Sequence, residues 1–267
     1  MAKNKKKVTT TVTTTVTEEI ISTPNNERTH IICILDRSGS MAGIMSDSIG
    51  GFNTFLKQQK ALPDEATITV ALFDDKYELL YDSVDIKKAE ELTNKVWYPR
   101  GTTALYDAIG KTINTDRAKL RSLGKEAPAK VLVCVVTDGL ENASQEYKGD
   151  PGRERIKSLI KECENDDWNF IYLAANQNAF AVGSSFGISY ANTHTYNATS
   201  AGVAGMSMTL NNATTSYRSM SSTSHDFKTA SKSLINDPNA DPDDKNEPQN
   251  SGSITTNNTT GTLTVKS

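Results

Sequence analysis

The 267-residue sequence predicts an α/β fold with a doubly wound, mostly parallel sheet, one antiparallel edge strand and helices on both faces. From about Thr29 to Ala201, apolar runs of strand length alternate with amphipathic stretches of helical length, which is the pattern of successive βαβ units. One of these runs, "AKVLVCVVTDG", is continuously apolar. Such a strand is typical of the middle of a sheet that is covered on both faces.

The first half of this pattern begins with the apolar strand "THIICIL", residues 29–35. A helix is expected over 44–60, because its apolar residues fall on roughly one face despite a pair of glycines. The segments 66–74 and 77–84 are rich in strand-forming residues and are separated by a turn at two aspartates. They therefore predict an antiparallel hairpin.

The second half begins with a long helix expected over 103–123, which ends at Gly124 because glycine commonly terminates a helix. The apolar central strand follows at 129–139, and an amphipathic helix is expected over 152–165. Four further elements complete the prediction: a strand at 169–176, a short helix at 177–187, an edge strand at 192–196 and a closing helix at 199–210.

Composition divides the chain into three parts. Residues 1–27 form a low-complexity arm of Lys, Val and Thr, and residues 28–210 form the α/β domain. Residues 211–267 are rich in Ser, Thr and Asn and include the Asp- and Pro-rich stretch "NDPNADPDDKNEPQN". Such segments do not contain enough apolar residues to form a core, so we expect a flexible C-terminal tail.

Charge and cysteine content narrow the range of functions. The net charge of −3 gives no electrostatic reason to expect a nucleic-acid partner. No window reaches the ~18 apolar residues of a membrane span, and no apolar signal segment follows the basic N-terminus. Cys33, Cys134 and Cys163 are widely spaced, which predicts buried, reduced thiols and a cytoplasmic location. The oligomeric state is not readable from the sequence.

Three loops carry oxygen-bearing side chains at points where they are expected to meet at the carboxyl edge of the sheet. These residues are Asp36, Ser38 and Ser40 after the first strand, Thr102 and Thr103 at the start of the long helix, and Thr137 and Asp138 after the central strand. Hydroxyls combined with one or two carboxylates suit Mg²⁺, and Mn²⁺ next. The sequence therefore predicts a divalent-cation site.

The same three loops resemble the metal-ion-dependent adhesion site of von Willebrand factor A-type (vWA) domains. "DRSGSM" resembles the first motif, "GTTALYDAI" the second and "TDG" the third. In the second motif the metal-site threonine directly precedes the small and apolar residues, which selects Thr103 over Thr102. The stretch "LAANQNAFAVGSSFGI" is similar to bacterial and phage-encoded members, so a virion-associated protein is expected if the gene is phage-encoded.

This resemblance implies roles for the site residues. Ser38, Ser40 and Thr103 donate oxygens directly to the ion, while Asp36 and Asp138 contact it or hold its waters. The sixth position takes an Asp or Glu carboxylate of a partner protein. The implied function is a non-enzymatic, cation-dependent protein-binding module.

Two other functions fit parts of the sequence. In a structural or assembly protein, the two tails would make the contacts and the metal site would only stabilise the fold. In a metal-dependent hydrolase or phosphotransferase, an aspartate after the first strand resembles dehalogenase-type phosphatases. Those have the pattern D-x-D, however, and position 38 is serine, so the second carboxylate is missing. "IGKT" at 109–112 lacks the spacing of a P-loop and falls within a predicted helix.

Overall fold

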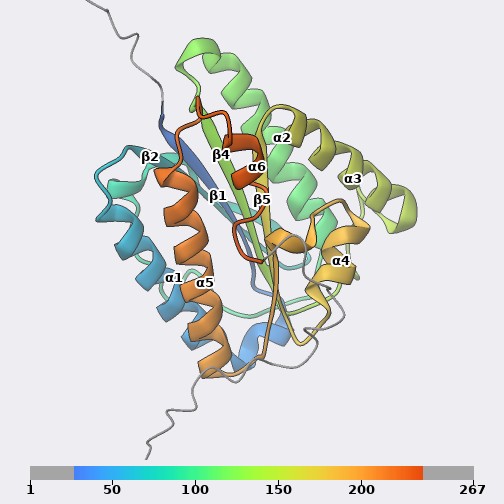
Figure 1. The fold of residues 1–267 in the computed structure, drawn as a ribbon. Helices are drawn as coiled ribbons and strands as arrows, with labels where there is room; N and C mark the ends of the chain where they lie inside the picture. Colours follow the sequence, from blue (N-terminus) through green and yellow to red (C-terminus); the bar gives the residue numbers. More distant parts are fainter. Residues whose placement is uncertain (1–26, 237–267) are drawn as a thin grey trace, which may run out of the picture.

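The computed structural model describes residues 27–236, which form a six-stranded sheet with helices on both faces (Figure 1). The strand order is β3-β2-β1-β4-β5-β6, and every neighbouring pair is parallel except β2 and β3. The strands are β1 (Thr29–Asp36), β2 (Ala66–Phe73), β3 (Tyr77–Asp85), β4 (Lys130–Thr137), β5 (Trp168–Ala175) and β6 (Thr193–Tyr196). The helices are α1 (Met45–Lys60), α2 (Leu105–Leu123), α3 (Gly149–Asn165), α4 (Ala179–Ser185), α5 (Ser200–Ser219) and α6 (Phe227–Ala230).

Two apolar cores lie on the two faces of the sheet. Because side chains alternate along a strand, Ile31, Cys33 and Leu35 of β1 belong to one core, while Ile32 and Ile34 belong to the other. Helices α1 and α5 cover the first core, and α2, α3 and α4 cover the second (Figure 1). Such two-sided burial explains why the central strands are apolar at almost every position.

The predicted fold class is confirmed. The hairpin of β2 and β3 forms the antiparallel edge, and the helix α2 ends at Gly124, whose φ of 54° suits a residue without a side chain. The three cysteines are buried and free, as the sequence predicted.

The closing helix α5 extends beyond residue 210, where the C-terminal tail was expected to begin. It continues to Ser219, and Leu210, Ala213 and Tyr217 are buried in the core on the α1 side. Their spacing of three and four residues is helical, but the surrounding Ser, Thr and Asn residues conceal it in the composition. Most of the predicted N-terminal arm, residues 1–26, and residues 237–267 of the predicted tail lie outside the described residues.

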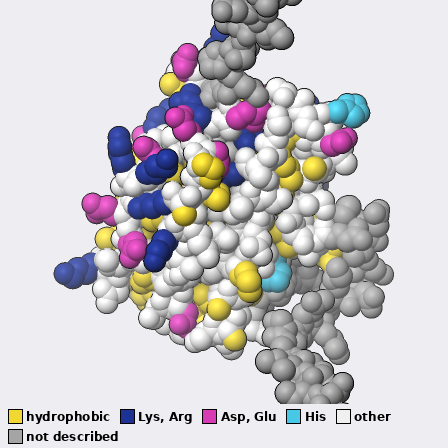
Figure 2. Space-filling model, turned by 60° about the vertical axis from the view of Figure 1, so that its left-hand side comes forward, with side chains coloured by type: hydrophobic (Ala, Val, Ile, Leu, Met, Phe, Trp, Pro, Cys, Tyr) yellow, Lys and Arg dark blue, Asp and Glu magenta, His cyan; other side chains and the backbone are white. Residues whose placement is uncertain are grey.

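The surface of the described part carries mixed charge. On the face shown in Figure 2, Lys and Arg side chains lie among Asp and Glu side chains, with hydrophobic side chains in small groups. Among residues 27–236, no helix is long and apolar enough to cross a membrane.

Candidate metal centre

The first and third predicted loops leave the two central strands at the same edge of the sheet. β1 ends at Asp36 and β4 ends at Thr137, and these strands are parallel neighbours. The Thr137 hydroxyl donates a hydrogen bond of 2.6 Å to Oδ2 of Asp36. The sheet itself therefore fixes the start of both loops side by side.

Side chains of these two loops are in direct contact. The hydroxyl of Ser40 donates to Oδ1 of Asp138 at 2.6 Å, and the hydroxyls of Ser38 and Ser40 lie 2.9 Å apart. Asp36 joins the same group, because its Oδ1 accepts a 2.6 Å bond from the backbone N–H of Ser38. Four of the five predicted ligands are thus linked by hydrogen bonds.

Thr103, the fifth predicted ligand, reaches this group across Gly139. A Cβ atom placed on Gly139 would lie 3.0 Å from Oγ1 of Thr103 and 3.4 Å from Oγ of Ser40. The two hydroxyls therefore converge on the space that the absence of a side chain leaves open. Thr103 lies two residues before α2, in the second loop. This loop therefore meets the first and third loops beside Gly139.

Both carboxylates of the group are in surroundings that disfavour their charge. Burial raises the pKa of Asp36 to about 6, although hydrogen bonds from Thr137 and Ser38 partly oppose the shift and the nearby Asp138 adds to it. Burial also raises the pKa of Asp138, against the hydrogen bond from Ser40. A bound cation would relieve the cost of both charges, since an opposite charge favours the ionised carboxylate.

The donor set fits a small, hard cation. It consists of two carboxylates and three hydroxyls, and oxygen is the ligand atom that Mg²⁺ and Mn²⁺ prefer. Residues 27–236 contain no group of three or more His, Cys, Asp or Glu side chains that could hold a metal ion. Any cation at this edge would therefore depend on the hydroxyls of Ser38, Ser40 and Thr103. That these residues bind one stays a prediction.

The buried carboxylate of Asp74, in the turn between β2 and β3, pairs with an arginine of the first loop and an arginine that precedes the second, and so ties these loops together. Arg37 and Asp74 are both almost completely buried, and Nε of Arg37 donates to Oδ2 of Asp74 at 3.1 Å. Arg100 donates to the same carboxylate oxygen, and its backbone N–H bonds the carbonyl of Arg37 at 2.8 Å. Close by, the N–H of Gly39 bonds the carbonyl of Gly101 at 3.1 Å.

The second loop is fastened to the third in a similar way. Oδ1 of Asn142 accepts from the backbone N–H of Thr103 at 2.9 Å, and the N–H of Asn142 returns a 3.0 Å bond to the Thr103 carbonyl. Glu141 accepts from the N–H of Tyr106 in the first turn of α2 at 2.9 Å. These contacts fix the backbone of Thr103, and Asn142 and Glu141 are positioning residues that the motif match did not identify.

His30 and His194 are not part of this group. His30 is buried at the other end of β1 from Asp36, where it contacts Thr67 at 2.7 Å and Asp116 at 3.2 Å. His194 lies in β6, and burial lowers its pKa.

Comparisons with known proteins give matches among solved structures alone. No family model matches the sequence, and the curated proteins contain no match. Manganese-loaded TRAP protein of Plasmodium vivax is 17% identical, with 68% of this chain and 72% of that chain covered and a TM-score of 0.50. A variant of the PilB minor pilin of Streptococcus sanguinis is 9% identical, with 69% and 60% covered and a TM-score of 0.51.

A third similar structure is a von Willebrand factor type A protein of Catenulispora acidiphila, which is 11% identical, with a TM-score of 0.47. The match covers 69% of this chain and 42% of that protein. This chain therefore spans less than two thirds of the length of the Catenulispora protein and of the pilin. At these identities the likeness is one of fold. With its strand order and its one antiparallel edge, the described part of the chain has the von Willebrand factor A fold.

Proposed function

We propose that this protein is a divalent-cation-dependent protein-binding module that recognises an Asp or Glu side chain of a partner. Ser38, Ser40 and Thr103 would supply neutral oxygens to Mg²⁺ or Mn²⁺, and Asp36 and Asp138 would supply negative charge. When bound, the cation provides a positive centre with a position for one further anionic oxygen.

The contact between Ser40 and Asp138 carries this proposal. These residues are 98 positions apart in the chain, yet their side chains meet at 2.6 Å beside the buried carboxylate of Asp36. Two carboxylates with raised pKa values and three converging hydroxyls have a common explanation in a cation site. The P. vivax protein of the same fold, described as manganese-loaded, supports the choice of ion.

The surface beside the site suits a protein partner. Leu140 follows Asp138 by two residues and is 60% exposed, which makes it one of the most exposed large hydrophobic residues of the described chain. A partner whose carboxylate reached the cation would bury this leucine against an apolar group of its own. The segments Met41–Ser46 and Glu141–Pro151, which lead into α1 and α3, follow the first and third loops and would add contacts.

Calorimetric titration with Mn²⁺ and Mg²⁺ tests the cation part of the proposal. We expect binding of one ion per chain in the wild type and a loss of affinity of at least about tenfold in Ser38→Ala and Asp138→Asn, because each removes an oxygen ligand. Ser158→Ala is the matched control, since that hydroxyl bonds only within its own helix. Equal affinity in all four proteins would contradict the proposal.

The carboxylate part has a separate readout. Paramagnetic relaxation of ¹³C-labelled acetate by protein-bound Mn²⁺ reports whether a carboxylate approaches the ion. We expect the wild type with bound Mn²⁺ to enhance the relaxation of acetate, and we expect no enhancement with the Asp138→Asn variant. Mn²⁺ binding without any effect on acetate would mean that the cation only stabilises the fold, and it would favour a structural role for the protein.

A further inference from the structure

A fourth loop, residues 176–178, leaves the sheet beside the candidate metal centre. It follows β5, whose Ala174 is level with Thr137 at the end of β4. Asn176 has a φ of 51°, and its Oδ1 accepts a backbone N–H bond of 2.9 Å from the segment after β6. Asn178 caps α4, because its Oδ1 accepts a bond of 2.9 Å from an N–H of the first turn. Both asparagine side chains thus shape the loop itself.

The side chain of Gln177, between these two asparagines, reaches the third loop of the site. Its Nε2 lies 3.4 Å from the carbonyl oxygen of Gly139, which is a long hydrogen bond. Its Oε1 is buried and has no hydrogen-bond partner among residues 27–236. The reverse orientation of the amide would turn Oε1 toward the carbonyl oxygen, where two acceptors would repel each other. Gln177 therefore directs its donor to the site loop and leaves a buried acceptor free.

Tyr172 lies beside this free acceptor. Its side chain is completely buried in the core that α2, α3 and α4 cover, and its hydroxyl also lacks a hydrogen-bond partner in the described part of the chain. Burial raises the pKa of Tyr172, and interaction with the Gln177 side chain opposes this shift in part. Because a phenol can donate and Oε1 can accept, a small adjustment of Gln177 satisfies both groups.

The carbonyl of Gly139 needs a donor that Thr137 does not supply. The Thr137 hydroxyl lies 2.6 Å from Oδ2 of Asp36 and 3.1 Å from this carbonyl, but it has a single proton. The shorter contact and the charge of a carboxylate direct that proton to Asp36. Among residues 27–236, the amide of Gln177 is the other side-chain donor within hydrogen-bond distance of the carbonyl. The peptide group between residues 139 and 140 therefore depends on Gln177 for its position.

This peptide group lies where the predicted ligands converge. A Cβ atom on Gly139 would lie 3.0 Å from Oγ1 of Thr103 and 3.4 Å from Oγ of Ser40, so a shift of the glycine changes how closely these hydroxyls approach. Leu140 follows directly and is 60% exposed. The same peptide group thus orients the apolar residue that we assign to the partner contact.

We propose that Gln177 is a positioning residue of the cation site, which links the hydroxyl of Tyr172 to the carbonyl of Gly139. It holds the third loop at the place where Thr103 and Ser40 meet. This inference rests on the proposed function. Gln177 is not one of the predicted ligands and lies outside the three site motifs, so it acts on cation binding through Gly139.

Calorimetric titration of Gln177→Met with Mn²⁺ tests this role. The substitution removes the amide donor and acceptor and nearly keeps the length of the side chain. We expect Mn²⁺ binding to be about tenfold weaker, at the lower end of the range for supporting contacts of metal sites. Asn178→Ala is the matched control in the same loop, because it removes the cap of α4 and leaves the contact with Gly139 in place. Its Mn²⁺ affinity should equal that of the wild type.

A second readout needs no metal. The ¹³C′ chemical shift of Gly139 reports hydrogen bonding at its carbonyl, and it should move upfield in metal-free Gln177→Met and stay unchanged in Asn178→Ala. Tyr172→Phe should have a smaller effect of the same sign on this shift and on Mn²⁺ affinity. Added to Gln177→Met, it should cause no further loss of affinity, because the two side chains act as one unit. Urea unfolding shows that each variant is folded.

The outcomes separate this inference from the function on which it rests. Mn²⁺ binding that depends on Ser38 but is unchanged in Gln177→Met would overturn the inference and leave the proposed function standing. Equal losses in Gln177→Met and Asn178→Ala would also overturn it, since they would reflect the loop as a whole. Absence of Mn²⁺ binding in the wild type would overturn both, and a changed ¹³C′ shift of Gly139 would then show a purely structural contact.

Discussion

Gly139 determines how closely two of the predicted ligands approach each other. The hydroxyls of Thr103 and Ser40 face the position where any other residue would carry its Cβ. A distance of 3.0 Å between Cβ and a hydroxyl oxygen is too short for relaxed packing, so a methyl group here would push Thr103 or the glycine aside. The cation site thus depends on a residue that donates no ligand.

Gly139→Ala is expected to weaken Mn²⁺ binding about tenfold, in the range found when positioning contacts of a metal site are lost. Its effect on the free energy of unfolding should be small, because the loop lies at the edge of the fold. Gly205→Ala is the matched control: its Cβ meets nothing within 4 Å, and alanine is the better helix former there. Calorimetric titration and urea unfolding of both variants check this, and unchanged Mn²⁺ affinity in Gly139→Ala would contradict the proposed convergence.

Single residues also show what sequence reasoning can and cannot predict. Asp36, Ser38, Ser40, Thr103 and Asp138 were predicted because motifs record local spacing, and the structure brings them to one edge of the sheet. The partnership of Arg37 with Asp74 left no such signal. An arginine can be expected to be buried when its acidic partner is known, and the partner of Arg37 is 37 positions away in the chain. Local spacing therefore does not indicate this ion pair.

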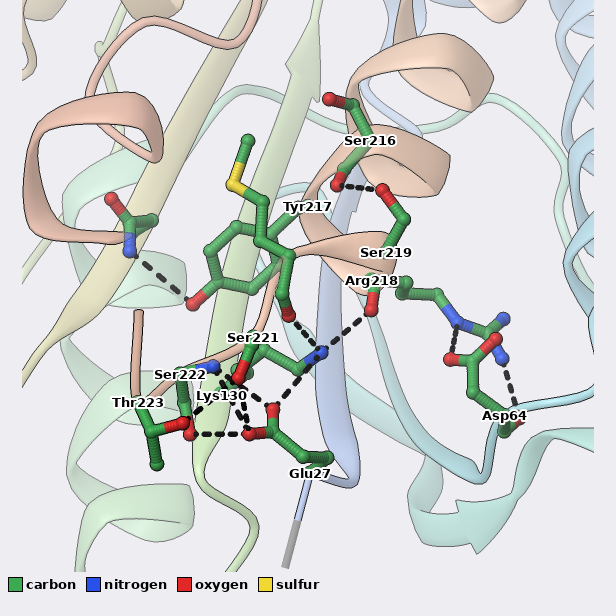
Figure 3. Close-up of polar contacts among 12 residues, drawn as sticks. Glu27, Asp64, Lys130, Ser216, Tyr217, Arg218, Ser219, Ser221, Ser222 and Thr223 are labelled. Atoms are coloured by element: carbon green, nitrogen blue, oxygen red, sulfur yellow. Dashed lines mark hydrogen bonds and ion pairs between the residues drawn. The ribbon is translucent and has the colours of Figure 1, made fainter. Parts of the chain in front are cut away.

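Among the elements, α5 departs most from its prediction. Its C-terminal end is fixed by Lys130, whose Nζ donates to the carbonyls of Arg218 at 2.6 Å and Met220 at 2.8 Å (Figure 3). The last turn of a helix has carbonyls without partners in the helix, and a buried ammonium group satisfies them here. Nε of Arg218 pairs with Asp64 at 2.7 Å, which ties the same turn to the segment before β2.

Lys130→Met should therefore loosen the end of α5. We expect a loss of about 2 kcal/mol in the free energy of unfolding, the value of a hydrogen bond to a charged group in a buried site. Amide exchange should accelerate at Tyr217–Met220, while Mn²⁺ affinity stays as in the wild type because Lys130 is at the opposite end of β4 from Asp138. The exposed Lys161→Met serves as control. Equal stability of the two variants would show that the lysine does not hold the helix.

The strands were predictable because burial on both faces makes β1, β4 and β5 apolar along nearly their whole length. The helical residues of α5 beyond 210 were not, because Ser, Thr and Asn dominate that stretch. Ala213 and Tyr217 are its buried apolar residues, and the polar Thr214 and Arg218 are buried beside them. Tertiary contacts, above all that of Tyr217 Oη with the carbonyl of Val131 at 3.0 Å, stabilise a helix that local composition does not favour.

At the scale of the whole molecule, the two ends of the sheet differ in chemistry. The amino edge holds charged groups that fasten the end of α5, such as Lys130 and Arg218. The carboxyl edge has fastening ion pairs of its own at Asp74, and beside them it holds the hydroxyls and the two carboxylates with raised pKa values. The exposed Leu140, two residues after Asp138, lies at this second edge.

Crystals grown with Mn²⁺ and measured at the manganese absorption edge test the central claim most directly, because the anomalous difference map locates the ion. The account predicts one strong peak bounded by Ser38, Ser40, Thr103 and Asp138, and no peak there in crystals of Ser38→Ala. A peak elsewhere, or none at this position in the wild type, would contradict the assignment of the three loops to a cation site.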